Sequence, residues 1–89
     1  MGELISRLPR ISELIEPTLN CLRANNGQAH FKTIEEWVVI ELGLSVEQRN
    51  LLRAGKRTEL QYRLSWARTK AKSEGIIENH GKGFWNLIK

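Results

Sequence analysis

Three capping boxes, in which Ser or Thr is followed three residues later by Glu or Gln, begin within 26 residues of one another in this 89-residue chain. In such a box the hydroxyl accepts a hydrogen bond from a backbone N–H at the helix start, and the Glu or Gln side chain accepts one from the N–H of the cap residue. Each box precedes apolar residues with helical spacing, so the middle of the chain is expected to be helical. The boxes are Thr33 with Glu36, Ser45 with Gln48, and Thr58 with Gln61.

The first expected helix covers residues 11–25, where Ile11, Leu14, Ile15, Leu19 and Leu22 form one apolar face and Asn25-Asn26-Gly27 supplies a stop. Pro17 leaves two alternatives open. Either the preceding segment is a separate turn and Pro17 lies in the first helical turn, or the helix kinks at Pro17.

The remaining elements follow from the other caps and from glycine stops. We expect a very short strand at 29–31, helices at 34–42, 46–53 and 59–74 that end at Gly43, Gly55 and Gly75, and a hairpin of 76–79 with 84–88. Ile34, Trp37, Val38 and Leu42 would anchor the second helix. This order predicts a mainly α fold with a small β-hairpin, an α+β winged helix-turn-helix at 11–89 after an N-terminal extension at 1–10.

The long helix at 59–74 has two informative faces. Leu60, Leu64, Ala67 and Ala71 form one narrow arc that must be buried. Gln61, Ser65, Arg68 and Lys72 form a second face that we expect to meet DNA, with Gln61 and Arg68 on base edges and Lys72 on phosphate. The alternative is a solvated face without a partner.

Charge is unevenly distributed along the chain. Residues 1–48 carry four Lys or Arg and seven Glu, a net −3, whereas residues 49–89 carry ten Lys or Arg and three Glu, a net +7. A basic half is typical of a polyanion binder, although a merely soluble charged surface is the alternative.

Lys56 and Arg57 precede the long helix, at whose N-terminus a phosphate is favoured, and Thr58 can cap the helix and contact phosphate as well.

The hairpin and the aromatic residues complete the candidate surface. Lys82, between Gly81 and Gly83, is expected at the hairpin tip, where it can reach phosphate or the minor groove, and His80 could add a contact. Tyr62 and Trp66 are expected to pack against the other helices or the hairpin, and Trp37 and Trp85 to lie in the core. By strand alternation, Trp85 and Leu87 should share the face that covers the helices.

Catalysis is not expected from this chain. It has no Asp, its two His residues lie in separate segments, and the neighbouring Glu35 and Glu36 diverge on a helix. Neither a phosphate-binding Gly-rich loop nor a zinc motif occurs, so no cofactor or metal is predicted. Cys21, the single cysteine, looks like a small buried hydrophobe and indicates a reducing, cytoplasmic setting, and no apolar run is long enough to span a membrane.

Motifs across nearly the whole chain, from about Ile11 to Ile88, resemble the N-terminal domain of Mrr-type restriction endonucleases. These motifs are Ile15-Glu16-Pro17-Thr18-Leu19, Glu41-Leu42-Gly43-Leu44-Ser45, Gln48-Arg49, Gly55-Lys56, Arg63 with Ser65-Trp66-Ala67-Arg68, Gly75-Ile76-Ile77 and Gly81-Lys82-Gly83-Phe84-Trp85. The resemblance implies a winged-helix module that directs a separate nuclease domain to duplex DNA, in some members DNA with modified bases. The family's nuclease motif, an Asp followed by Glu or Gln and a Lys, is absent here.

This chain would then be the recognition part alone, either a fragment or a stand-alone homologue, with its nuclease domain in the same or a partner chain. The resemblance implies a cytoplasmic, DNA-associated protein of a bacterium or archaeon. Two alternatives stay open. The winged helix could be a protein-interaction or dimerisation module for an acidic partner, or a transcription regulator that binds an operator as a homodimer.

Overall fold

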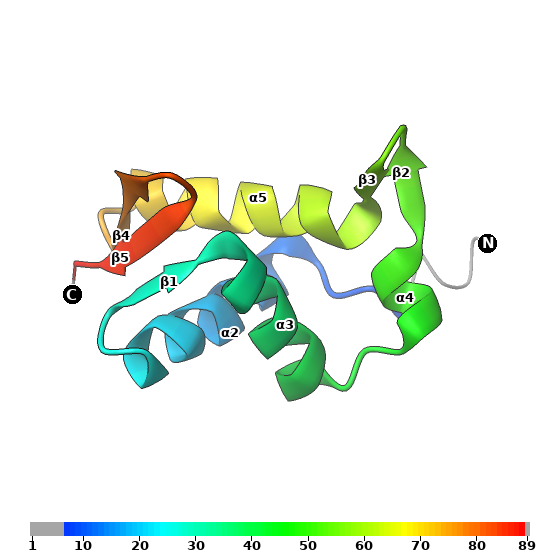
Figure 1. Ribbon diagram of the computed structural model, residues 1–89, viewed down its shortest axis with the longest axis horizontal. Helices are drawn as coiled ribbons and strands as arrows, with labels where there is room; N and C mark the ends of the chain where they lie inside the picture. Colours follow the sequence, from blue (N-terminus) through cyan, green and yellow to red (C-terminus); the bar gives the residue numbers. More distant parts are fainter. Residues whose placement is uncertain (1–6, 89) are drawn as a thin grey trace.

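The computed structural model describes residues 7–88 and contains three main helices, a short helix and two small sheets (Figure 1). The main helices are α2 (Ile11–Ala24), α3 (Phe31–Leu42) and α5 (Glu59–Ser73), and the short helix is α4 (Val46–Asn50). Strands β1 (Gln28–His30), β5 (Phe84–Leu87) and β4 (Ile77–Gly81) form one antiparallel sheet in that order, and β2 (Leu52–Ala54) pairs with β3 (Arg57–Thr58). This is an α+β fold compatible with a winged helix, as predicted.

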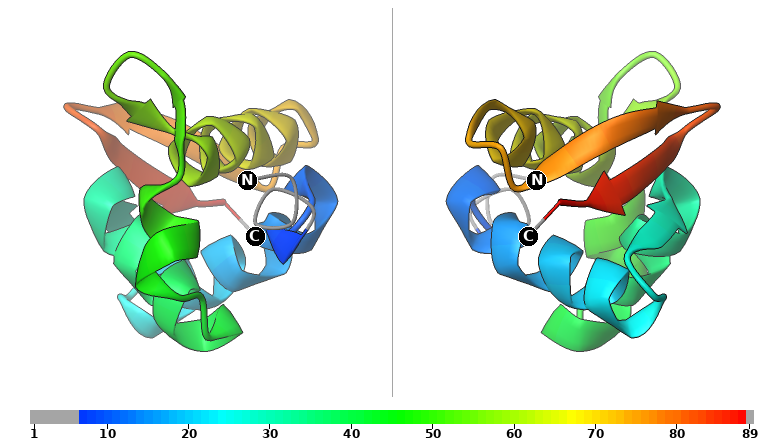
Figure 2. Two further views of the ribbon diagram at one scale, coloured as in Figure 1. Left: turned by 90° about the vertical axis from the view of Figure 1, so that its right-hand side faces the viewer. Right: turned by 90° about the vertical axis from the view of Figure 1, so that its left-hand side faces the viewer.

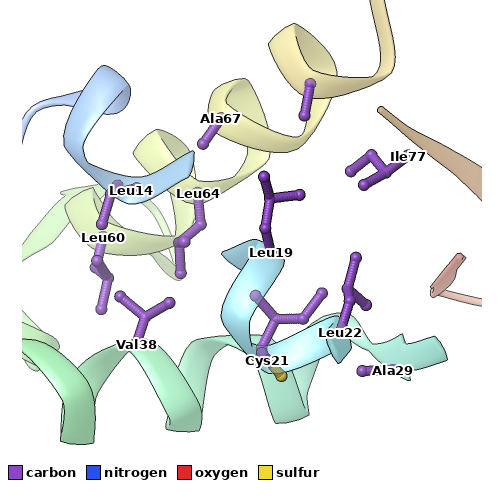
Figure 3. Close-up of a cluster of buried hydrophobic side chains, with 12 residues drawn as sticks. Leu14, Leu19, Cys21, Leu22, Ala29, Val38, Leu60, Leu64, Ala67 and Ile77 are labelled. Atoms are coloured by element: carbon purple, nitrogen blue, oxygen red, sulfur yellow. The ribbon is translucent and has the colours of Figure 1, made fainter. Parts of the chain in front are cut away.

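The core lies where α2, α3 and α5 meet (Figure 3). The predicted arc of α5 is confirmed, because Leu60, Leu64, Ala67 and Ala71 are all at most 1% exposed. Cys21 is also buried as expected, and burial raises the pKa of its thiol. Trp37, Trp85 and Leu87 pack against this cluster from its edge and are only partly buried, and Leu42 is exposed.

Helix α2 runs from Ile11 to Ala24 with Pro17 buried inside it, so the segment before Pro17 is not a separate turn. Residues 7–10, which we assigned to an extension, contact the domain: Leu8 is buried, and Arg63 Nη1 donates to the carbonyls of Leu8 and Pro9 at 3.3 and 3.0 Å. The rest of the expected extension, and Lys89 at the other end, lie outside the described residues.

The capping boxes at Ser45 and Thr58 are confirmed, but the start predicted at Thr33 is wrong. Helix α3 begins at Phe31, and His30 is its N-cap, with Nδ1 accepting from the Lys32 N–H at 3.1 Å. Helix α3 starts early because β1 pairs with β5, Ala29 with Trp85 and His30 with Phe84, and the helix begins at the residue that follows this strand. This pairing is long-range, and local spacing does not report it.

The helix predicted over 46–53 is also shorter than expected, because it ends at Asn50. Leu52–Ala54 then pairs back on Arg57–Thr58 across a turn that contains Gly55 at φ +58°. This β2–β3 hairpin was not expected, because Gly55 was interpreted as a helix stop rather than as the turn of a hairpin. It leads directly into α5.

Strands β4 and β5 form the expected C-terminal hairpin, called the C-terminal wing below, and Lys82 lies at its tip with φ +55°. Trp85 and Leu87 face the helical core, as strand alternation predicted. In the described part of the chain, no helix is both long and apolar enough to cross a membrane.

Candidate nucleic-acid interface

Helix α5 lies along one side of the molecule with a hairpin at each end (Figure 1). The β2–β3 hairpin precedes its N-terminus, and the C-terminal wing follows its C-terminus. The two end views show both hairpin tips projecting to the same side of α5 (Figure 2). The predicted site residues therefore lie on one ridge made of α5 and two hairpins.

Four of these residues lie at the ends of the ridge. Lys56 and Arg57 are exposed on the β2–β3 hairpin, and Lys82 is exposed at the tip of the C-terminal wing. Lys72 is exposed in the last turn of α5. Thr58 is the N-cap of α5, and its Oγ1 accepts from the Gln61 N–H at 3.0 Å, so its capping role is confirmed.

Gln61 is occupied at both ends of its side chain. Its amide oxygen accepts from the Thr58 N–H at 3.0 Å, and its amide nitrogen donates to Glu35 Oε1 on α3 at 3.4 Å. An adenine contact by Gln61 requires both hydrogen bonds to be exchanged, including one that caps α5. Ser65, one turn further along, is half-buried.

Arg68 is half-buried in a pocket of about 190 Å³ that Phe31 and Glu35 of α3 line together with Arg57, Gln61 and Leu64. Its guanidinium carbon is 5.8 Å from the Phe31 ring centre and 5.5 Å from that of Trp85. Burial lowers the pKa of Arg68, the charge of Arg57 lowers it further, and Glu35 opposes both effects. Its buried Nε has no hydrogen-bond partner among residues 7–88. The pocket thus holds a cation with unused hydrogen-bonding capacity.

Sequence reasoning misplaced Trp66, which is 49% exposed on the outer face of α5 instead of packed against the core. Thr69, Lys70 and Ser73 are exposed beside it, so the outermost face of the helix is turned away from the predicted one. The reason is that α3 and the C-terminal wing partly cover the Gln61, Ser65 and Arg68 side. Tyr62 is half-buried, but its ring contacts the β2–β3 hairpin, which was not predicted: the guanidinium carbon of Arg53 lies 3.5 Å from the ring centre, and the ring lies edge-on to Trp66 with centres 6.5 Å apart.

Glu59, in the first turn of α5, is a buried carboxylate at the centre of an ion-pair network that the sequence did not predict. Its carboxylate accepts from Arg63 Nε at 2.8 Å and from Arg53 Nη1 on β2 at 3.1 Å. The Arg63 hydrogen bond lowers the pKa of Glu59, a shift that burial opposes and that Arg53 reinforces. The sequence offered one signal for this network, an Arg shortly before a helix whose first residue is Glu.

The ridge is strongly cationic. Of the eight Lys and Arg side chains on α5 and the two hairpins, Arg53 and Arg63 pair with Glu59. No ion pair within residues 7–88 engages the other six, which are Lys56, Arg57, Arg68, Lys70, Lys72 and Lys82. Over residues 7–88 no group of three His, Cys or Glu side chains is placed to hold a metal ion.

Fold and surface together define a small basic α+β domain that presents a long helix between two hairpins. The chain matches the family of Mrr N-terminal domains over residues 12–88, and it belongs to that family, the N-terminal domains of Mrr-type restriction proteins. Searches of curated proteins and of solved structures each gave no match to this chain.

Proposed function

We propose that this chain is the DNA-recognition module of a restriction-type system, that it binds duplex DNA with α5 and the C-terminal wing, and that it contributes no catalytic residue. Its nuclease domain would lie in the same chain or in a partner chain. The observation that carries the proposal is the cationic ridge, whose six unpaired side chains lie along one helix and two hairpins.

The roles follow from the chemistry of the groove. A helix fits the major groove, where base edges are read, and Lys or Arg at the ends of the element neutralise phosphates. Lys56, Arg57, Lys72 and Lys82 have exposed ammonium or guanidinium groups suited to phosphate, and Ser65 is small enough to allow close approach. Arg68 is our candidate for a base contact, because swinging out of its pocket gives its unpartnered Nε a hydrogen-bond acceptor.

Modified DNA is the finer part of the proposal. Discrimination of a methyl group in the major groove needs an apolar side chain that reaches the base. Trp66 is large, apolar and half-exposed on the outer face of α5, so it is the residue best suited to that contact. Because this face is turned away from Arg68, the Trp66 contact and the Arg68 base contact correspond to alternative orientations of α5 in the groove.

The test is a fluorescence-anisotropy titration of the domain against labelled random-sequence duplexes, methylated and unmethylated, between about 50 and 200 mM salt. If about five phosphates are contacted, log K should fall against log salt with a slope near −4 to −5. A preference for methylated duplex that Trp66→Ala abolishes would support the finer proposal. Absence of binding to either duplex would contradict the proposal that this chain binds DNA.

Arg68→Met tests the base contact, because Met retains the length of the side chain and removes the charge. We expect duplex affinity to fall by about 1–3 kcal/mol if Arg68 contacts a base. Folding stability should be unchanged or higher, since a buried unpaired nitrogen disappears. Urea unfolding separates the two effects, and normal binding by the variant would exclude Arg68 from the interface.

Protein interaction is the second candidate, and one observation favours it. Ile40 is 80% exposed on α3 and lines an apolar pocket with Trp37 and Glu41, apart from the ridge. A nuclease domain could dock there while α5 binds DNA, so the two functions are compatible. Dimerisation and operator binding stay predictions, and sedimentation with and without duplex would test both.

A further inference from the structure

The β2–β3 hairpin makes almost no contribution to the core. All three residues of β2 are exposed, Leu52 is 63% exposed, and Thr58 is the one residue of the two strands that is partly covered. Ordering a surface hairpin costs conformational entropy, and an isolated two-stranded hairpin is at best marginally stable in water. Apolar burial therefore does not explain why this segment is ordered.

The hairpin is nevertheless fixed to α5 by specific contacts. The Arg53 guanidinium lies over the Tyr62 ring with its carbon 3.5 Å from the ring centre, and the same Arg pairs with Glu59 at 3.1 Å. The Leu51 carbonyl accepts from the Glu59 N–H at 2.8 Å, where the strand pair meets the helix. These contacts fix the direction in which the tip projects.

The hairpin is also more basic than the C-terminal wing. Residues 52–58 contain Arg53, Lys56 and Arg57 and no acidic residue, whereas residues 77–87 contain Lys82 and Glu78. The exposed acid nearest in sequence, Glu47, lies on α4, and Glu59 is already engaged by two Arg side chains. Lys56 lies in the turn of the hairpin, and Arg57 follows it on β3, where it also lines the Arg68 pocket; neither has a carboxylate ion-pair partner within residues 7–88.

The dimensions suit a duplex. With 15 residues, α5 is about 22 Å long, whereas the whole domain extends 37 Å along its longest axis, parallel to which α5 runs in Figure 1. At 3.4 Å per base pair these lengths correspond to about 6 and about 11 base pairs.

We propose that the β2–β3 hairpin is a second wing, which binds the phosphate backbone beyond the N-terminal end of α5 while the C-terminal wing binds beyond the other end. The inference rests on the proposed function and deepens it, because it makes the hairpin that carries Lys56 and Arg57 a wing with its own place on the duplex. The two wings would hold the duplex at both ends of the recognition helix.

The test compares two double variants that lose the same charge. Lys56→Gln with Arg57→Gln alters the hairpin tip and spares Arg53, which fixes the hairpin. Arg10→Gln with Arg23→Gln is the matched control at the two ends of α2, a helix that lies away from the hairpin tips (Figure 2). Circular dichroism and urea unfolding establish that both variants fold.

Loss of two phosphate contacts should make the salt slope less negative by about 2, so that the affinity ratio of wild type to hairpin variant shrinks about tenfold between 50 and 200 mM salt. With duplexes of increasing length, wild-type affinity should rise up to about 11 base pairs, and the hairpin variant should reach its plateau about two or three base pairs earlier. The control double variant should keep the wild-type slope and length dependence.

The failures are distinguishable. If the wild-type domain binds with a steep salt slope and the hairpin variant keeps that slope, the second wing is excluded and the proposed function stands. Equal effects of both double variants would also exclude it, because net charge alone would explain the loss. Absence of salt-dependent binding by the wild type would overturn both.

Discussion

Glu59 shows how much a single carboxylate can determine in a domain of this size. It lies at the first position of α5, where the positive end of the helix dipole favours an anion, and it joins Arg53 of the hairpin to Arg63 of the helix. Arg63 in turn donates to the Pro9 carbonyl at 3.0 Å. One side chain therefore couples the hairpin, the long helix and the segment before α2.

Glu59→Gln should destabilise the fold and remove part of its pH dependence. The folded pKa of Glu59 lies below its unfolded value of about 4.3, so its contribution is complete above that value and is lost as pH falls through the folded pKa. At pH 7 we expect a cost of about 1.5–3 kcal/mol, typical of hydrogen bonds to a charged group. Urea unfolding at pH 7 and at pH 3 measures both effects.

The matched control is Glu36→Gln, an exposed carboxylate on α3. This variant should unfold like the wild type at both pH values. A Glu59→Gln curve that coincides with the Glu36→Gln curve at pH 7 would show that the ion pairs contribute no net stability.

Trp66→Ala should cost far less than a core tryptophan. Truncation of a buried aromatic side chain costs about 3–5 kcal/mol, and Trp66 is 49% exposed, so a loss of roughly 1–2 kcal/mol is expected. Thermal unfolding measures the loss, with Trp85→Ala as the more damaging comparison. A cost as large as that of Trp85→Ala would mean that Trp66 is buried in solution.

At the scale of elements, the C-terminal wing is attached to the start of α3 at Gly83. The Phe31 N–H donates to the Gly83 carbonyl at 2.9 Å. A Cβ at Gly83 would lie 2.7 Å from His30 Nε2 and 2.8 Å from the Phe31 ring, whereas a Cβ at Gly81 would meet open space. Both glycines have positive φ, at +83° and +93°.

Gly83→Ala should therefore destabilise the domain more than Gly81→Ala does. Each variant incurs backbone strain of roughly 1–2 kcal/mol at positive φ. The contact with Phe31 and His30 adds about 1–3 kcal/mol at Gly83 alone, a typical cost of overpacking. Denaturant unfolding of the pair isolates the contact, and equal costs would show that the wing does not press against α3.

The ends of helices that local interactions determine could be predicted from the sequence, whereas those that long-range strand pairing determines could not. The C-terminal ends at Gly43 and Gly75 and the caps at Ser45 and Thr58 are local, and the sequence reports them. The start of α3 depends on β1 pairing with a strand more than fifty residues away, which no local pattern reveals. The β2–β3 hairpin was missed because Gly55 fits a helix stop as well as a turn.

The candidate site likewise has features that local sequence predicts and features that depend on long-range packing. The positions of the cations on α5 follow from helical spacing and that of Lys82 from the expected C-terminal hairpin, and the predicted buried arc is correct, whereas the hairpin that carries Lys56 and Arg57 was not predicted. Which side of α5 is outermost depends on how α3 and the wing cover it, so Trp66 was misplaced. The engagement of Gln61 by Glu35 and the pocket around Arg68 also depend on α3, and neither was predictable from spacing within α5.

At the scale of the whole molecule, the cationic ridge should repel itself in the free domain, and a bound polyanion should relieve that repulsion. Duplex DNA at about 100 times its dissociation constant should stabilise the domain by about 2.7 kcal/mol, provided that the unfolded chain binds weakly. For a domain of this size the gain corresponds to a rise in melting temperature of roughly 10–20 °C.

The rise should fade as salt is added, because binding through phosphate contacts weakens steeply between about 50 and 200 mM. Salt alone should have the opposite effect on the free domain, since screening reduces the repulsion within the ridge and raises its melting temperature slightly. Differential scanning fluorimetry across a salt series, with and without duplex, should therefore give two curves that converge at high salt. Curves that coincide at low salt as well would mean that the ridge does not bind DNA, and the apolar pocket at Ile40 on α3 would then become the surface to study.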